Sequence, residues 1–279
     1  MQARQMLIKV PEITIYFWAI KILCTTVGET AADYMNWNLN LGLTSTTYIM
    51  GTLLAVALFF QFRGRNYVPS VYWLAVVFLS IFGTLVTDNL TDVFEVKLEI
   101  TTIAFSVALA IIFAAWYKAE KTLSIHSIYT TRRETFYWLV IFFTFALGTA
   151  AGDLLSERFE LGYLTSIGIF GALLGVIAVA HLKFKLNAVL AFWLAYILTR
   201  PFGASIGDYL SQLPQYGGLG FGTIISSVIF LVAILAMVIY LTVTKKDAPC
   251  LEVKVLENLS KTKKNRENED DEEKLGRYR

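Results

Sequence analysis

Apolar residues form eight long runs along the chain, separated by short polar segments. Each run holds roughly 20 mostly apolar residues, enough to cross a hydrocarbon core about 30 Å thick as an α-helix. The pattern therefore predicts an all-α, polytopic membrane protein with eight transmembrane helices. The runs lie near residues 12–33, 44–62, 71–88, 99–117, 136–154, 163–182, 188–208 and 221–244.

The composition supports this interpretation. Of the 279 residues, 56% are hydrophobic and 16% are charged, whereas about a quarter of a soluble domain is usually charged. A soluble globular enzyme is therefore excluded. Cys24 and Cys250 are the two cysteines of the sequence, which offers no disulfide framework. The N-terminus lacks the cleavage pattern of a signal peptide, so the first apolar run is expected to be retained.

Basic residues gather in alternate connections between the runs. One set of connections carries twelve Lys and Arg residues, and the other carries only Lys97 and Arg158. Because basic connections stay on the cytoplasmic side, this asymmetry predicts that both termini are cytoplasmic. The basic set comprises Arg4, Lys9, Arg63, Arg65, Lys118, Lys121, Arg132, Arg133, Lys183, Lys185, Lys245 and Lys246.

The composition changes after Thr244. Residues 245–279 are rich in Lys, Glu, Asp and Asn and contain an acidic run from Glu267 to Glu273. Such a segment buries too little apolar surface to fold alone. We therefore expect a transmembrane domain over residues 1–244 and a disordered, charged cytoplasmic tail over residues 245–279.

An internal repeat organises the transmembrane domain. Four tryptophans are each followed ten residues later by Gly and fifteen residues later by Asp. Columns in such register indicate four copies of one two-span hairpin, near residues 12–65, 66–120, 132–186 and 187–244. Because each copy holds two spans, all four are parallel repeats related by pseudo-symmetry. The three columns are Trp18, Trp73, Trp138 and Trp193; Gly28, Gly83, Gly148 and Gly203; and Asp33, Asp88, Asp153 and Asp208.

These tandem hairpins, with a Trp and a downstream Gly and Asp, resemble a bacterial membrane-protein family. That family is known only as a "repeat of unknown function", or as uncharacterised membrane-anchored proteins. The resemblance covers about residues 10–244. It implies a multi-pass protein of the bacterial inner membrane but no chemistry, so the function must be inferred from the residues themselves.

The repeated positions share one face of each odd-numbered span. At about 100° per residue, positions 0, 3, 7, 10, 11, 14 and 15 after each Trp fall within an arc of roughly 140°. We therefore expect the odd-numbered spans to surround a central axis, with the even-numbered spans outside. The glycines either let helix backbones approach closely or open the backbone so that carbonyls line a site. The tryptophans either anchor the interface or line the axis: Trp18, Trp73, Trp138 and Trp193.

The aspartates are the main candidates for ion binding. Each is predicted at the C-terminal end of an odd span, where the helix dipole already disfavours a carboxylate, and four converging acids repel one another. A bound cation would relieve both effects, and Glu29 would add a further ligand. Alternatively, each Asp bonds backbone amides of its own loop. The predicted ligands of a hard metal ion such as Mg²⁺, Mn²⁺ or Ca²⁺ are Asp33, Asp88, Asp153 and Asp208.

Three further charges lie on the same face. Lys21, Glu29 and Arg200 occupy positions 3, 11 and 7 of their repeats. Intramembrane charges point toward protein or a water-filled cavity, because facing lipid costs several kcal/mol. If the repeats close into a ring, spans one and seven are neighbours, which predicts a Glu29–Arg200 ion pair with Lys21 nearby. This charge network is either a gate or a structural pair that fixes repeat four against repeat one.

These features favour a transporter or channel that carries a cation, above all a hard divalent metal ion, through a central acidic vestibule, with a proton or a monovalent cation left open as the substrate. Two alternatives stay open: a carrier of an organic solute or anion that uses Lys21 and Arg200, and a non-transport membrane scaffold or sensor. The expected partners are the lipid bilayer and the cation. No enzymatic activity, cofactor or nucleic-acid partner is expected, and the sequence makes no prediction about oligomeric state.

Overall fold

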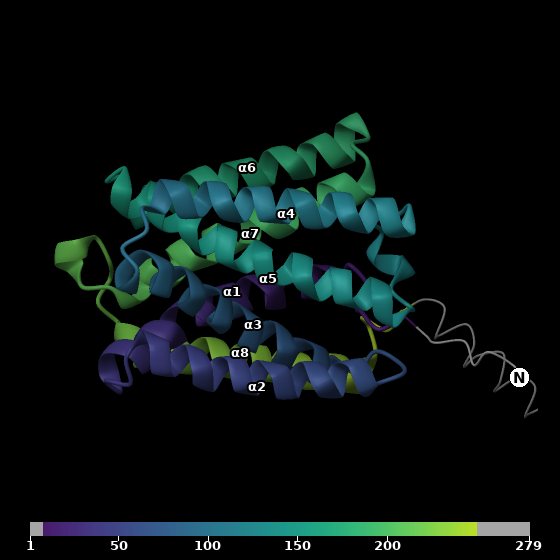
Figure 1. Cartoon of the computed structure of the whole chain (residues 1–279), viewed down its shortest axis with the longest axis horizontal. Coiled ribbons are helices and arrows are strands. Elements are labelled where there is room, and N and C mark those ends of the chain that lie inside the picture. The colour runs from purple at the N-terminus through teal and green to yellow at the C-terminus, as the bar shows by residue number, and fades with distance from the viewer. Residues whose placement is uncertain (1–7, 250–279) are drawn as a thin grey trace, which may run out of the picture.

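The computed structural model describes residues 8–249, apart from the side chains of Trp37 and Glu157, and confirms the all-α class. In Figure 1, α4 and α6 lie along the upper edge, α2 and α8 along the lower edge, and the odd-numbered helices between them. The long helices are α1 (Ile15–Asp33), α2 (Leu43–Arg63), α3 (Pro69–Asp88), α4 (Leu98–Glu120), α5 (Thr131–Asp153), α6 (Tyr163–Phe184), α7 (Ala188–Ser211) and α8 (Gly222–Thr244).

Local sequence signals set the starts of the odd-numbered helices. Thr14 and Thr130 accept hydrogen bonds from the free backbone N–H groups of the first turns of α1 and α5, and Asn187 does the same for α7. Pro69 occupies the first position of α3, where its missing N–H has no intrahelical partner to lose. We call this end of the bundle the basic end, after its Lys- and Arg-rich connections, and the opposite end the acid end.

The odd-numbered helices form a closed inner ring, as predicted. Helix α1 packs against α3 and α7, and α5 packs against the same two helices. Each even-numbered helix lies outside this ring on the odd-numbered helix of the following repeat. Thus α2 packs on α3, α4 on α5 and α6 on α7, and α8 closes the cycle on α1.

This arrangement corrects the picture of four packed hairpins. In the first three repeats the two helices of one repeat make little contact with each other. The reason is the connection at the acid end, over residues 34–42, 89–97 and 154–162, which carries the chain across to the neighbouring inner helix. The repeats therefore interlock, and each one completes its packing only with the next.

Seven helices within residues 8–249 are long and apolar enough to cross a membrane. The eighth long helix, α1, is less apolar than the other seven, because it includes Lys21 and Glu29. The structure therefore supports seven of the eight expected spans. More than half of the residues in spans α3, α5 and α7 are buried, against fewer than a third in the outer helices. The outer faces expose Leu, Ile, Val and Phe, as expected of helices surrounded by lipid. The protein is therefore a multi-pass membrane protein.

The repeated glycines lie where the inner helices approach most closely. A Cβ atom at any of the four would overlap a side chain of the next inner helix, which favours the close-packing interpretation over an opened backbone. The overlaps also follow the ring, from each repeat to the next. The pairs are Gly28 with Ser80, Gly83 with Phe145, Gly148 with Arg200 and Gly203 with Thr25.

Residues before α1 pack against the basic end of the bundle. Ile8 and Val10 are buried, and the buried Lys9 forms an ion pair with Glu134 of α5, with Nζ and Oε2 2.7 Å apart. Gln61 at the end of α2 donates to the other carboxylate oxygen of Glu134 at 3.1 Å. Sequence reasoning missed this network, because neither charged residue recurs in the repeats.

The chain immediately after α8 belongs to the same end. The backbone N–H of Glu12 donates to the carbonyl oxygen of Asp247 at 3.0 Å, and the Tyr67 hydroxyl donates to the Asp247 carboxylate. Asp247 is 1% exposed. The charged segment predicted from residue 245 therefore begins with residues that pack against the bundle. The rest of the predicted tail, residues 250–279, lies outside the described residues.

Asp247 is expected to make stability depend on pH. Burial raises the pKa of the Asp247 carboxyl above its ordinary value of about 3.9, and the hydrogen bond from Tyr67 offsets part of the rise. The folded protein therefore holds this proton more tightly than the unfolded chain. The resulting stabilisation is complete below the ordinary pKa and is lost as the pH rises through the raised pKa.

We expect Asp247→Asn to flatten the fall in thermal-unfolding midpoint as the pH rises above about 4 in detergent micelles. Glu95→Gln is the matched control, because Glu95 is exposed. Superimposable pH profiles for Asp247→Asn and the wild-type protein would contradict this prediction.

Candidate functional site

The helices pass through a distinctive turn next to the repeated aspartates. In the first three repeats the α-helix ends at Asp33, Asp88 or Asp153, and five residues of π-helix follow it. In the fourth repeat Asp208 lies inside α7, which continues to Ser211. The aspartates were predicted at helix C-termini, but the helical path continues beyond each of them. The repulsion from a helix end, which is strong only in the last turn, is therefore weaker than expected for Asp33, Asp88 and Asp153, whereas Asp208 lies in the last turn of α7. The π-helices are Tyr34–Asn38, Asn89–Val93 and Leu154–Arg158.

The four aspartates line one cavity at the acid end. Its volume is about 770 Å³, and Glu29 and Asp92 add two more carboxylates to its wall. No Lys or Arg is found among the described residues that line it. The structure thus brings together acids from all four inner helices. We call this cavity the vestibule. Its repeat aspartates are Asp33, Asp88, Asp153 and Asp208.

Neutral polar groups complete the vestibule wall. Gln212 donates from Nε2 to Oδ2 of Asp33 at 3.1 Å, and Thr91 donates to Asp92 at 2.9 Å. The hydroxyl of Ser211 is buried and has no hydrogen-bond partner among residues 8–249. Sequence reasoning missed Ser211 and Gln212, although they stand only three and four residues after Asp208. The vestibule therefore offers polar groups beyond the acids.

The acids lie around the wall of the vestibule and do not converge on a single point. Within residues 8–249, no group of three or more His, Cys, Asp or Glu side chains is arranged to hold a metal ion. Direct ligation of one metal ion by Asp33, Asp88, Asp153 and Asp208, as predicted from the sequence, therefore has no support in this structure.

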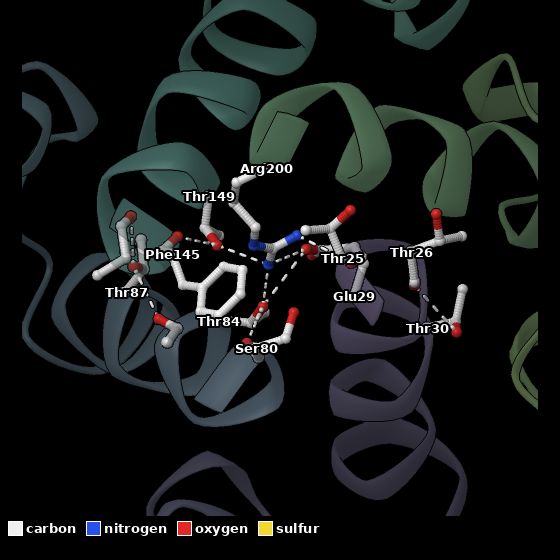
Figure 2. Close-up of polar contacts among 12 residues, drawn as sticks. Thr25, Thr26, Glu29, Thr30, Ser80, Thr84, Thr87, Phe145, Thr149 and Arg200 are labelled. Atoms are coloured by element: carbon white, nitrogen blue, oxygen red, sulfur yellow. Dashed lines mark hydrogen bonds and ion pairs between the residues drawn. The ribbon is translucent and has the colours of Figure 1, made fainter. Parts of the chain in front are cut away.

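The predicted Glu29–Arg200 ion pair is present below the vestibule. Nη2 of the fully buried Arg200 lies 2.9 Å from Oε2 of Glu29 and also donates to the hydroxyls of Thr84 and Thr149, the latter at 2.8 Å. Nη1 donates to the backbone carbonyl of Thr25 at 3.1 Å. Figure 2 shows the guanidinium of α7 reaching between α1, α3 and α5. We call these oxygens the guanidinium cage.

The guanidinium cage contains the residue from one and the same repeat position in each of the first three repeats. Glu29, Thr84 and Thr149 all stand eleven residues after the Trp of their repeats. One arginine from repeat four therefore bonds the same column in each of the other three repeats. The sequence placed Thr84 and Thr149 in this column, but only the fold shows that they bind Arg200.

Lys21 does not join this ion pair. Its side chain is fully buried, and Nζ has no hydrogen-bond partner in the described part of the chain. Nζ lies 4.2 Å from the ring centroids of both Phe145 and Tyr196. Of the predicted charge network, Glu29 and Arg200 form an ion pair, and the amino group of Lys21 packs against two aromatic rings.

Aromatic side chains fill the bundle toward the basic end. The residue before each repeated Trp is itself aromatic and buried, and its ring packs on the Trp of the next repeat. From the first repeat to the fourth, the distances between the centroids of the paired aromatic rings are 5.6, 5.5, 6.2 and 5.7 Å. We call these four residues the aromatic layer. The pairs are Phe17 with Trp73, Tyr72 with Trp138, Tyr137 with Trp193, and Phe192 with Trp18.

Three of the four repeated tryptophans reach grooves or an outer helix, and Trp73 is buried within the bundle. Trp18 lines an apolar groove between α1, α6 and α7, and Trp138 lines another between α2, α3 and α5. Trp193 reaches Trp116 of the outer helix α4 and donates from Nε1 to the carbonyl of Leu123 at 2.9 Å. The inner bundle below the vestibule is closed by the guanidinium cage, Lys21 and the aromatic layer.

Comparison with known families agrees with the repeat analysis. A family model described as "Repeat of Unknown Function (DUF347)" matches residues 16–67, 71–122, 136–186 and 191–247. The chain belongs to this family. The four matched segments coincide with the four predicted repeats, so the resemblance noted from the sequence is confirmed. No curated protein and no solved structure matches the chain.

Proposed function

We propose that this DUF347 protein moves a cation across a bacterial inner membrane. In this proposal all eight long helices span the bilayer, and both termini and the basic end face the cytoplasm, in line with the distribution of Lys and Arg. The observation that carries the proposal is the vestibule, a single cavity of about 770 Å³ lined by the four repeat aspartates and Glu29.

The electrostatics of the vestibule suit cation entry. Six carboxylates line it, and the nearest guanidinium is already bonded to Glu29 below it. Low-dielectric walls of one charge sign focus the field and raise the local concentration of counter-ions. Rings of acidic side chains serve this purpose at the mouths of cation pores.

Glu29 links the vestibule to the closed part of the axis. Its carboxylate lines the cavity and also binds Arg200. A cation that reaches Glu29 competes with Arg200 for the same oxygens. Displacement of the guanidinium would break the bonds by which Arg200 ties α7 to α1, α3 and α5. The structure represents the closed state in this scheme, and Arg200 acts as the gate.

Flux measurements in liposomes test the proposal. We expect Asp33→Asn, Asp88→Asn, Asp153→Asn and Asp208→Asn each to lower cation flux, by about ten-fold for the most affected, which corresponds to about 1.4 kcal/mol. Glu95→Gln is the control, because Glu95 is an exposed acid at the same end that does not line the vestibule. Wild-type flux in all four aspartate variants would remove the vestibule from the mechanism.

One observation favours a non-transport scaffold instead. The inner bundle is filled from the guanidinium cage to the aromatic layer, and no metal-ligating group is found within residues 8–249. A scaffold predicts that wild-type liposomes show no flux of any cation. The anion-carrier alternative is not favoured, because neither Lys21 nor Arg200 lines the vestibule.

A further inference from the structure

We propose that the cation is a small organic one that carries ammonium or guanidinium groups. This inference rests on the proposed function of the vestibule and names the substrate class. Three independent features carry it: the way the acids are spread, the guanidinium cage and the surroundings of Lys21.

The spread of the acids suits an extended cation better than a bare metal ion. Mg²⁺ requires about six oxygen ligands at about 2.0–2.1 Å, and Ca²⁺ takes about six to eight at about 2.3–2.6 Å. Among the residues that the structure describes, six carboxylates lie around this cavity of about 770 Å³, and no three of them are placed to ligate one ion. A cation with two or more separated charges contacts several of these acids at once. The unpartnered, buried hydroxyl of Ser211 adds a neutral acceptor to the same wall.

The guanidinium cage shows that the floor already binds an organic cation. Its oxygens come from the Glu29 carboxylate, the Thr84 and Thr149 hydroxyls and the Thr25 carbonyl. A guanidinium carries five N–H donors and no acceptor, so a set of oxygens from three helices complements it. The chain's own Arg200 therefore marks the chemistry that this level of the axis recognises.

A second amine-binding level follows toward the basic end. The Lys21 amino group lies over the faces of Phe145 and Tyr196, with 4.2 Å to each centroid. Aromatic faces attract ammonium groups through the ring quadrupole. Two successive levels of the axis thus hold nitrogen groups of the protein itself, a guanidinium among oxygens and an amino group on aromatic rings. A substrate amine that displaces Arg200 from Glu29 meets the same chemistry in the same order.

Equilibrium binding to the full-length protein in nanodiscs tests the class. The probes are spermidine, putrescine, guanidinium at low millimolar concentration, Mg²⁺ and Mn²⁺, compared by calorimetry at one ionic strength because salt screens exposed charges. We expect spermidine to bind at least about ten-fold more tightly than Mg²⁺. Glu29→Gln and Asp88→Asn should each weaken spermidine binding by about ten-fold, and Glu95→Gln should leave it unchanged.

A rescue experiment tests the cage separately. Arg200→Ala leaves the cage oxygens without their cation. We expect low millimolar guanidinium to raise the thermal-unfolding midpoint of Arg200→Ala and to leave that of the wild-type protein unchanged. If Arg200→Ala does not fold without guanidinium, the yield of folded Arg200→Ala purified in the presence of low millimolar guanidinium is measured instead, and a yield that guanidinium does not raise would contradict the inference.

The outcomes separate this inference from the proposed function. Tighter binding of Mg²⁺ or Mn²⁺ than of any amine, with dependence on Asp88, overturns the organic-cation class and leaves the vestibule as a cation site. Amine binding that survives both Glu29→Gln and Asp88→Asn reflects surface attraction and also overturns the inference. Failure of every cation to bind overturns both proposals.

Discussion

Replacing Arg200 by Met is expected to destabilise the protein by about 3–5 kcal/mol. Arg200 is 0% exposed, and its guanidinium is the charged partner of Glu29. Met keeps an unbranched apolar stem but ends before the position of the guanidinium, so the main loss is the ion pair and the hydrogen bonds to Thr84 and Thr149. The substitution leaves the Glu29 carboxylate with its counter-charge removed, which is the costly way to break a buried pair.

Equilibrium unfolding in mixed micelles measures this effect, and a double-mutant cycle assigns it. The double variant Arg200→Met with Glu29→Gln removes both charges. It should therefore be more stable than Arg200→Met alone, since no unpaired charge is left. Strictly additive losses in the cycle would show that the two side chains do not interact energetically.

Replacing Gly83 by Ala is expected to destabilise the bundle by about 1–3 kcal/mol. The added Cβ would lie 2.8 Å from Cβ of Phe145 and 3.2 Å from the backbone nitrogen of Ala146. Neither atom moves by a simple side-chain rotation, so α3 and α5 must separate to make room. The better helix propensity of Ala, worth up to about 1 kcal/mol, offsets only part of this cost.

Gly175→Ala is the matched control for this prediction. Gly175 lies within α6, and nothing lies within 4 Å of the position that its Cβ would take. The same substitution there adds helix propensity without a clash, so the thermal-unfolding midpoint should stay the same or rise. Equal midpoints for the two variants would mean that close approach is not the reason for glycine at position 83.

Much of the candidate site could be predicted from the repeat columns. A residue fifteen positions after each Trp falls on the same helix face in every repeat, so four like side chains must converge once the repeats form a ring. The vestibule aspartates follow from this reasoning. So does the Glu29–Arg200 pair, because closure makes repeat four the neighbour of repeat one.

It was harder to predict which of two neighbouring residues on one helix faces the inner bundle. Phe17 precedes Trp18 by one residue, so the two side chains are about 100° apart and Phe17 falls just outside the arc of the repeated positions. Both residues are aromatic, so periodicity alone does not decide which one faces the inner bundle. The rotation of each helix about its own axis decides this, and it depends on how all eight helices pack. The aromatic layer was missed for that reason.

The partners of Arg200 illustrate a second kind of limit. Thr84 and Thr149 also bond the backbone carbonyls four residues earlier, at 3.3 and 3.2 Å. A threonine inside a helix usually forms such a local hydrogen bond, so the sequence did not indicate that these hydroxyls have a long-range partner. No sequence pattern indicated the Lys9–Glu134 ion pair, because it joins two residues outside the repeat columns.

The sequence by itself determined the all-α class, the four parallel repeats, the DUF347 membership and the face on which the acids gather. These follow from hydropathy and helical periodicity, which are local properties of the chain. Only the tertiary structure decided that each outer helix packs on the next repeat, that the described acids are not grouped around one metal ion and that Thr84 and Thr149 bind Arg200. These depend on helix rotation and on contacts between residues as far apart as Thr84 and Arg200, which no local pattern encodes.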